Sequence, residues 1–130
     1  MLRIKIISPG KHKEPWLTSA LNEYEKRLTG DAKIEWVFPK ELSIKSEKYS
    51  LLDVKGKILT SEQFSTFLIS EPIHTFVIGG PDGPPKEVIE HASFRFSLSS
   101  LTFTHQFVRL ILLEQIYRGI QISKGSSYHR

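Results

Sequence analysis

A glycine-rich turn follows the most strand-like apolar segment of the chain. Residues 78–83 read Ile-Gly-Gly-Pro-Asp-Gly and come directly after the β-rich run that begins at Ile73. Open α/β sheets bind their ligands at the carboxyl ends of buried strands, where glycine lets a ligand approach the backbone closely. The same residues could instead form a tight turn between a strand and a helix. Their spacing fits neither the dinucleotide fingerprint nor a P-loop, so it does not indicate phosphate binding.

A second candidate is the segment from Ser97 to His105, which is rich in small and hydroxyl residues. Its backbone groups could surround a polar ligand. The simpler interpretation is a turn that ends in a helix N-cap at Thr102 or Thr104. His105 stands at the start of the following helix, where a histidine acts either as a base or as a structural residue.

The chain ends in Tyr128, His129 and Arg130, which are an aromatic ring, an imidazole and a guanidinium. Such groups can stack on a nucleobase and hold phosphates. A terminus of this kind is otherwise commonly frayed and solvated, so the residues alone leave both interpretations open. The chain shows no spacing typical of metal ligands, and we expect no metal.

These segments must be positioned by an alternation of strands and helices. Apolar alternation and β-rich runs predict strands at 2–7, 34–38, 49–54, 73–78 and 94–98. Helical spacing, a capping box and a proline pair predict helices between Pro15 and Gly30, after Thr60, from Pro84 to Ala92 and from His105 to about Gln121. Residues 40–48 are expected to form a loop. This order predicts an α/β fold, with a mostly parallel sheet and helices on both faces.

The composition is that of a single globular domain over residues 1–130. Hydrophobic residues make up 39% and charged residues 25% of the chain, and cysteine is absent. The lack of cysteine excludes disulfides, thiolate metal sites and a cysteine nucleophile. No segment is apolar enough to cross a membrane or to act as a signal peptide, so we expect a cytoplasmic protein. The net charge of +4 favours a polyanionic partner such as nucleic acid.

The last predicted helix has apolar residues on nearly every side. A chain this short has little protein of its own to cover such a helix, so a second copy of the chain is the expected partner. The alternative is a central helix that is covered within the monomer.

Several motifs follow one another along nearly the whole chain. They are Leu52-Asp53-x-x-Gly56, Ile78-Gly79-Gly80-Pro81-x-Gly83, Ser97-Leu98-Ser99 with Leu101-Thr102-x-x-His105, Glu114-Gln115-x-Tyr117-Arg118 and the terminal Tyr128-His129-Arg130. As an ordered set they resemble the RlmH family. RlmH proteins are SPOUT-class methyltransferases, which use S-adenosylmethionine to methylate N3 of a pseudouridine in a stem-loop of 23S ribosomal RNA.

The resemblance implies a fold, a cofactor site and a set of residues that contact the RNA. The C-terminal segment is expected to form a deep trefoil knot, and a homodimer is expected to complete each site, with the tail of one subunit reaching its partner's cofactor. The residues implied to hold S-adenosylmethionine are Leu52, Gly80, Ser99, Ser100, Leu101, Thr102, Phe103 and Thr104. The residues implied for the RNA and catalytic side are His105, Arg118, Tyr128, His129 and Arg130.

Methyl transfer mainly requires that the donor sulfonium lies in line with the nucleophilic nitrogen. Because the N3 proton must leave, a base is useful, and His105, His129 and Tyr128 are all candidates. An arginine near the uracil carbonyl oxygens would stabilise the developing charge.

The chain departs from the family pattern at two places. Family members usually carry a longer insert before the position of Leu52, with a basic loop and a helix, where this chain has only residues 40–51. Thr104 stands where the family usually has proline, and threonine relaxes the backbone angle that proline fixes. Two alternatives therefore remain: a SPOUT enzyme with another RNA target, or an inactive relative that binds the ribosome.

Overall fold

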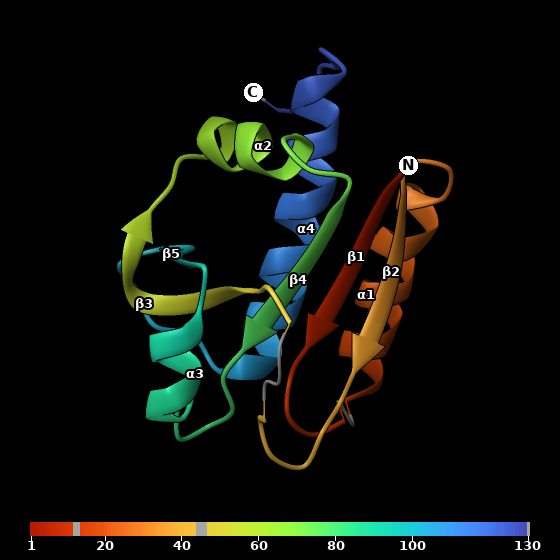
Figure 1. Cartoon of the computed structure of the whole chain (residues 1–130). Coiled ribbons are helices and arrows are strands. Elements are labelled where there is room, and N and C mark those ends of the chain that lie inside the picture. Colours follow the sequence, from red (N-terminus) through yellow and green to blue (C-terminus); the bar gives the residue numbers. More distant parts are fainter. Residues whose placement is uncertain (12–13, 44–46, 130) are drawn as a thin grey trace.

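The structure, a computed structural model, describes residues 1–11, 14–43 and 47–129 (Figure 1). Strands and helices follow the predicted order. Their bounds are β1 (Leu2–Ile7), α1 (Pro15–Leu28), β2 (Ala32–Val37), β3 (Ser50–Ile58), α2 (Ser61–Ile69), β4 (Ile73–Ile78), α3 (Lys86–His91), β5 (Phe94–Ser97) and α4 (His105–Ser123).

Within the described residues the strands form one sheet in the order β2-β1-β4-β3-β5. Every neighbouring pair is parallel, which confirms the predicted parallel sheet. Because parallel strands run in the same direction, the segments after β4 and β5 lie at one edge of the sheet. Leu52, in the middle of β3, pairs with Ile78 at the end of β4 and so reaches the same edge. This edge therefore gathers the glycine-rich turn and the segment 97–105.

Helices cover both faces of the sheet, as predicted, but not equally. Alternate residues of a strand point to opposite faces. Ile6 and Phe76 pack beneath α1, α2 and α4 in the larger core. Ile7 and Val77 point to the other face, where α3 contributes Val88 to a smaller core.

The helix α4 lies against both α1 and α2 (Figure 1). Its buried residues recur every three or four positions and include Arg109, Leu112 and Ile116. Leu112 is fully buried, so it belongs to the core of the monomer and is not available for contact with a second copy of the chain. Phe107 leaves its ring about half exposed, at 47%. The monomer thus covers one side of α4.

No helix in the described part of the chain is long and apolar enough to cross a membrane.

Strand β3 is longer than the predicted 49–54, because its second half pairs with β5 through an irregularity. Leu52 and Lys57 both align with Phe96, and the register shifts between them. Gly56 lies in this shifted segment. A Cβ at Gly56 would come within 2.6 Å of the backbone nitrogen of Phe96. The residues around Gly56 are polar and show no apolar alternation, so periodicity does not predict this extension of β3.

Gly56→Ala is expected to destabilise the fold by about 1–3 kcal/mol, because backbone atoms of β5 cannot move aside as a side chain can. Urea denaturation would measure the change in the free energy of unfolding. Lys57→Ala, at an exposed position of the same strand, is the control and should change it by less than about 0.5 kcal/mol. Equal stability of Gly56→Ala and the wild type would contradict the close approach of β3 and β5.

Candidate functional site: a pocket at the carboxyl edge and a polar cluster at the C-terminus

A pocket of about 610 Å³ lies at the carboxyl edge of the sheet. Its walls come from residues 52–54 in the middle of β3, the turn after β4, the segment after β5 and the first turn of α4. This volume lies within the range of roughly 300–1,000 Å³ that is typical of small-molecule sites. The lining combines apolar side chains with loop backbone, which suits a ligand with both apolar and polar parts.

Of the residues that the sequence implied for the cofactor, all but Ser100 line this pocket. They are Leu52, Gly80, Ser99, Leu101, Thr102, Phe103 and Thr104. His105 lines it as well. Residues that are up to 53 positions apart in the chain are therefore brought to one cavity.

The two adjacent glycines after β4 differ in what surrounds them. A Cβ at Gly79 would lie 2.8 Å from Cδ of Pro84, so packing within the turn requires this glycine. A Cβ at Gly80 would make only ordinary contacts, 3.6 Å from Cβ of Pro9. The turn hypothesis thus explains Gly79, whereas nothing within the described chain requires Gly80 to be glycine.

The segment after β5 is shaped by its own hydroxyl groups. Ser97 Oγ donates to the carbonyl of Ser99 at 2.6 Å, and the backbone N–H of Leu101 donates to Ser99 Oγ at 3.1 Å. Thr104 caps α4 by accepting a hydrogen bond from the backbone N–H of Phe107 at 3.4 Å. The N-cap expected at Thr102 or Thr104 is therefore Thr104, and the same segment also lines the pocket.

Arg109 is a functional candidate that the sequence reasoning missed. Its side chain is fully buried, with Nε donating to Ser8 Oγ at 2.8 Å and Nη2 donating to the carbonyl oxygens of Pro9, at 2.8 Å, and Gly10. The guanidinium also lies over the ring of Phe38. Burial lowers the pKa of Arg109 to about 10, so it remains a cation at neutral pH.

Arg109 therefore ties the loop after β1 to α4, next to the pocket. The sequence signal that could have revealed the burial of Arg109 is its position, because it is three residues before Leu112 and seven before Ile116, on the buried side of the helix. Burial, together with the charge of Arg109, also lowers the pKa of His105. His105 is accordingly neutral at pH 7.

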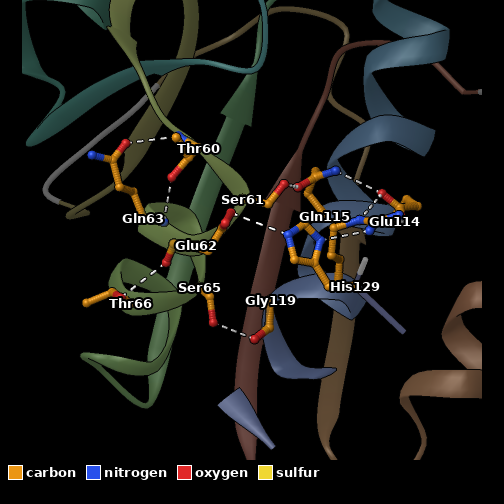
Figure 2. Close-up of polar contacts among 11 residues, drawn as sticks. Thr60, Ser61, Glu62, Gln63, Ser65, Thr66, Glu114, Gln115, Gly119 and His129 are labelled. Carbon is orange, nitrogen blue, oxygen red and sulfur yellow. Dashed lines mark hydrogen bonds and ion pairs between the residues drawn. The ribbon is translucent and has the colours of Figure 1, made fainter. Parts of the chain in front are cut away.

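A polar cluster lies in the second half of α4, around the carboxylate of Glu114 (Figure 2). Arg118 Nη2 donates to this carboxylate at 2.9 Å, and the hydroxyl of Tyr128 donates to it at 2.8 Å. The ring of Tyr128 packs edge-on against Tyr117, with centroids 4.8 Å apart, and lies beneath the guanidinium of Arg118. The tail is thus docked on α4 through Tyr128.

His129 extends this cluster towards α2. Arg118 Nη1 lies 3.0 Å from His129 Nδ1, and His129 Nε2 lies 3.4 Å from a carboxylate oxygen of Glu62 (Figure 2). Arginine can only donate, so Nδ1 accepts and the ring proton is on Nε2, facing Glu62. Arg130, the last predicted residue of this group, lies outside the described residues.

The predicted residues therefore form two groups within one chain. His105 begins α4 and Arg118 lies 13 positions later, which at 1.5 Å per residue is roughly 20 Å along the helix axis. Figure 1 shows the C-terminus beside the last turns of α4, at the opposite side of the molecule from the carboxyl end of β4. A single chain does not bring His105 together with the tail. Among the described residues no cluster of His, Asp and Glu could hold a metal ion.

Comparison with known proteins first gives the class. A family model described as "Predicted SPOUT methyltransferase" matches residues 38–129, which include every wall of the pocket and the whole of the polar cluster. The chain belongs to the SPOUT methyltransferases.

Full-length relatives narrow the class further. A protein of Protochlamydia amoebophila is 48% identical over 141 aligned positions, with all of both chains covered. Proteins of Thermodesulfovibrio yellowstonii and Acetivibrio thermocellus are 41% and 40% identical, with 99% or more of each chain covered. All three are named ribosomal RNA large subunit methyltransferase H. Within the SPOUT class the chain belongs to this RlmH family, as its motifs predicted.

The alignments also bear on chain length. The alignment with a Desulfitobacterium hafniense relative covers all of both chains and takes 160 positions, against 130 residues here. At least 30 of these positions therefore have no residue in this chain. The chain is therefore shorter than this relative, and the expected place of the missing segment, before Leu52, stays a prediction.

Glu114→Gln is expected to lower the pKa of Tyr128. Burial, followed by the hydrogen bond to Glu114, raises the pKa of this phenol above its usual value, and an amide removes the negative charge that opposes ionisation. Ultraviolet titration of the phenolates would measure the shift, with Tyr128→Phe identifying which of the four tyrosines is responsible. An unchanged titration curve in Glu114→Gln would contradict the docking of Tyr128 on Glu114.

Proposed function

We propose that the chain is an S-adenosylmethionine-dependent methyltransferase that methylates N3 of a pseudouridine in 23S ribosomal RNA of the large subunit. The observation that carries the proposal is the pocket shared by Leu52, Gly80, Ser99 and residues 101–104, in a member of the RlmH family. The enzyme would act in the cytoplasm, where ribosomes are found. The C-terminal trefoil knot stays a prediction from the family.

The pocket suits S-adenosylmethionine in size and chemistry. Its volume accepts a nucleoside with an amino-acid side arm. Leu52, Leu101 and Val108 offer apolar contacts, and the loop backbone offers donors and acceptors for an adenine edge. The open face of Gly80 permits close approach of the ligand to the backbone. When bound, the cofactor supplies an electrophilic methyl group on a sulfonium.

The polar cluster supplies the groups that suit an RNA partner. Arg118 can hold a phosphate or a uracil carbonyl oxygen, and Tyr128 can stack on a base. Arg118 is already paired with Glu114, so contact with RNA would replace a carboxylate by an RNA oxygen. The net charge of +4 attracts the RNA backbone over longer distances.

The distance between pocket and tail supports a homodimer with shared sites. If the site needs both groups, the tail must come from another copy, because His105 and Arg118 are roughly 20 Å apart along the helix of one chain. An exposed apolar patch near the start of α4 supports the same conclusion. Its members, Trp16, Phe103 and Phe107, are 43–47% exposed, and the rings of Trp16 and Phe107 lie 5.2 Å apart. Covering such a patch favours association.

In this arrangement the chain works by positioning. The pocket loops would fix the donor, while Arg118 and the tail of the partner subunit would orient the base for an in-line approach of N3. Arg118 would also stabilise the charge that spreads to the uracil oxygens as N3 loses its proton. The raised pKa of Tyr128 keeps it a phenol at neutral pH, which suits stacking and donation.

The proposal is tested by mapping methylated pseudouridine in 23S rRNA from cells that lack the protein. Wild-type protein is expected to restore the methyl mark. Modification at a different nucleotide, or binding to ribosomes without modification, would contradict the proposed target or activity respectively.

Gly80→Val is expected to abolish S-adenosylmethionine binding and the methyl mark with little change in melting temperature, because its side chain would fill space at the pocket wall. Calorimetry with S-adenosylmethionine measures the loss. The control is Gly80→Ala, whose single methyl group fits beside Pro9 and should preserve the fold and weaken binding less. Wild-type affinity in a folded Gly80→Val protein would show that no ligand approaches this glycine.

A further inference from the structure

The side chain of Gln106 links the buried Arg109 to His105 at the pocket wall. Arg109 Nη1 lies 3.3 Å from Gln106 Oε1, and Gln106 Nε2 lies 3.0 Å from His105 Nε2. These contacts come from two successive turns at the start of α4, so they form a short chain of hydrogen bonds that ends at the pocket.

The direction of each hydrogen bond in this chain follows from its donors. An arginine has N–H donors and no acceptor, so the atom of Gln106 that faces Arg109 must be the amide oxygen. The amide nitrogen of Gln106 then faces His105, and it can only donate. His105 Nε2 must therefore accept, which leaves the proton of the neutral ring on Nδ1.

Arg109 anchors this series of hydrogen bonds and is itself held in place by several partners. Arg109 is fully buried and donates at the same time to Ser8 and to the carbonyl oxygens of Pro9 and Gly10. It cannot turn towards another partner without leaving these oxygens unsatisfied. The neutral state of His105 agrees with its lowered pKa, which results from burial and from the charge of Arg109.

We propose that Arg109 and Gln106 hold His105 as the Nδ1–H tautomer, so that His105 serves the methyltransferase site as a hydrogen-bond donor and not as the proton acceptor. Nε2 is occupied by Gln106, whereas Nδ1 has no partner within the part of the chain that the structure describes. The free Nδ1–H suits a carbonyl oxygen of the target uracil, which gains charge as N3 loses its proton. Arg109 and Gln106 are positioning residues in this scheme.

The tautomer is tested first on the free protein, so this arm is independent of the proposed reaction. Long-range proton–nitrogen NMR of the five histidines, recorded where all are neutral and assigned with His105→Asn, distinguishes protonated from bare ring nitrogens. We expect a protonated Nδ1 and a bare Nε2 for His105. Gln106→Glu should reverse this pattern, because a carboxylate only accepts. Gln121→Ala, further along α4, is the control and should leave it unchanged. A protonated Nε2 in the wild type, or no response to Gln106→Glu, would overturn the proposal.

The donor role rests on the proposed function and has its own test. In His105→Asn the side-chain amide keeps an N–H near the position of Nδ1 but cannot act as a base. We expect His105→Asn to retain at least about tenfold more methyl transfer than His105→Ala, with similar affinity for S-adenosylmethionine, since one preorganised donor is worth that much or more. Equal loss of activity in the two variants would show that His105 does not act as a donor. If wild-type protein does not methylate rRNA, the proposed function fails while the NMR result still stands.

Discussion

The length and direction of α4 determine how the functional residues of this protein can be combined. The helix is fixed to the sheet and to α1 and α2 by a buried stripe that includes Leu112, Ile116 and Ile120. Its first residue lies in the wall of the pocket, and its second half carries the cluster around Glu114. Because a helix does not shorten, His105 in the pocket wall and Arg118 in the cluster stay roughly 20 Å apart along the helix axis of one chain. The homodimer with shared sites that we propose follows from this separation.

Polar contacts orient the side chains in both halves of α4. In the first half, Arg109 satisfies the carbonyl oxygens of the loop after β1 and, through Gln106, orients His105. In the second half, Glu114 accepts hydrogen bonds from Arg118 and Tyr128. A buried charge such as Arg109 is retained only where such partners exist, so its contacts couple the packing of the helix to the orientation of His105.

Apolar periodicity and turn residues were sufficient to predict the strands and helices, because these depend on local sequence, and the alternation of strands and helices then indicated a parallel sheet. The strand order and the extension of β3 past Gly56 depend on distant pairing with β5, so periodicity does not contain them. Position after a strand indicated two of the pocket walls, the turn after β4 and the segment after β5, whereas Leu52 lies inside β3 and was implied only by the family resemblance. The role of Arg109 was hidden because a lone charge in an apolar helix has the same pattern whether its partners are water or buried carbonyl groups. The docking of Tyr128 was equally invisible, because its partner Glu114 lies 14 residues away.

The claim that each active site is shared between two chains is tested most directly with a mixed dimer. One chain carries Gly80→Val and the other Arg118→Ala, the two chains bear different affinity tags, and only dimers with both tags are purified. Each variant alone should be inactive. If pocket and tail come from different subunits, the mixed dimer contains one intact site and should show about half of the wild-type methyl transfer per dimer. If each chain uses its own tail, the mixed dimer contains no intact site, and an inactive mixed dimer would contradict the shared site.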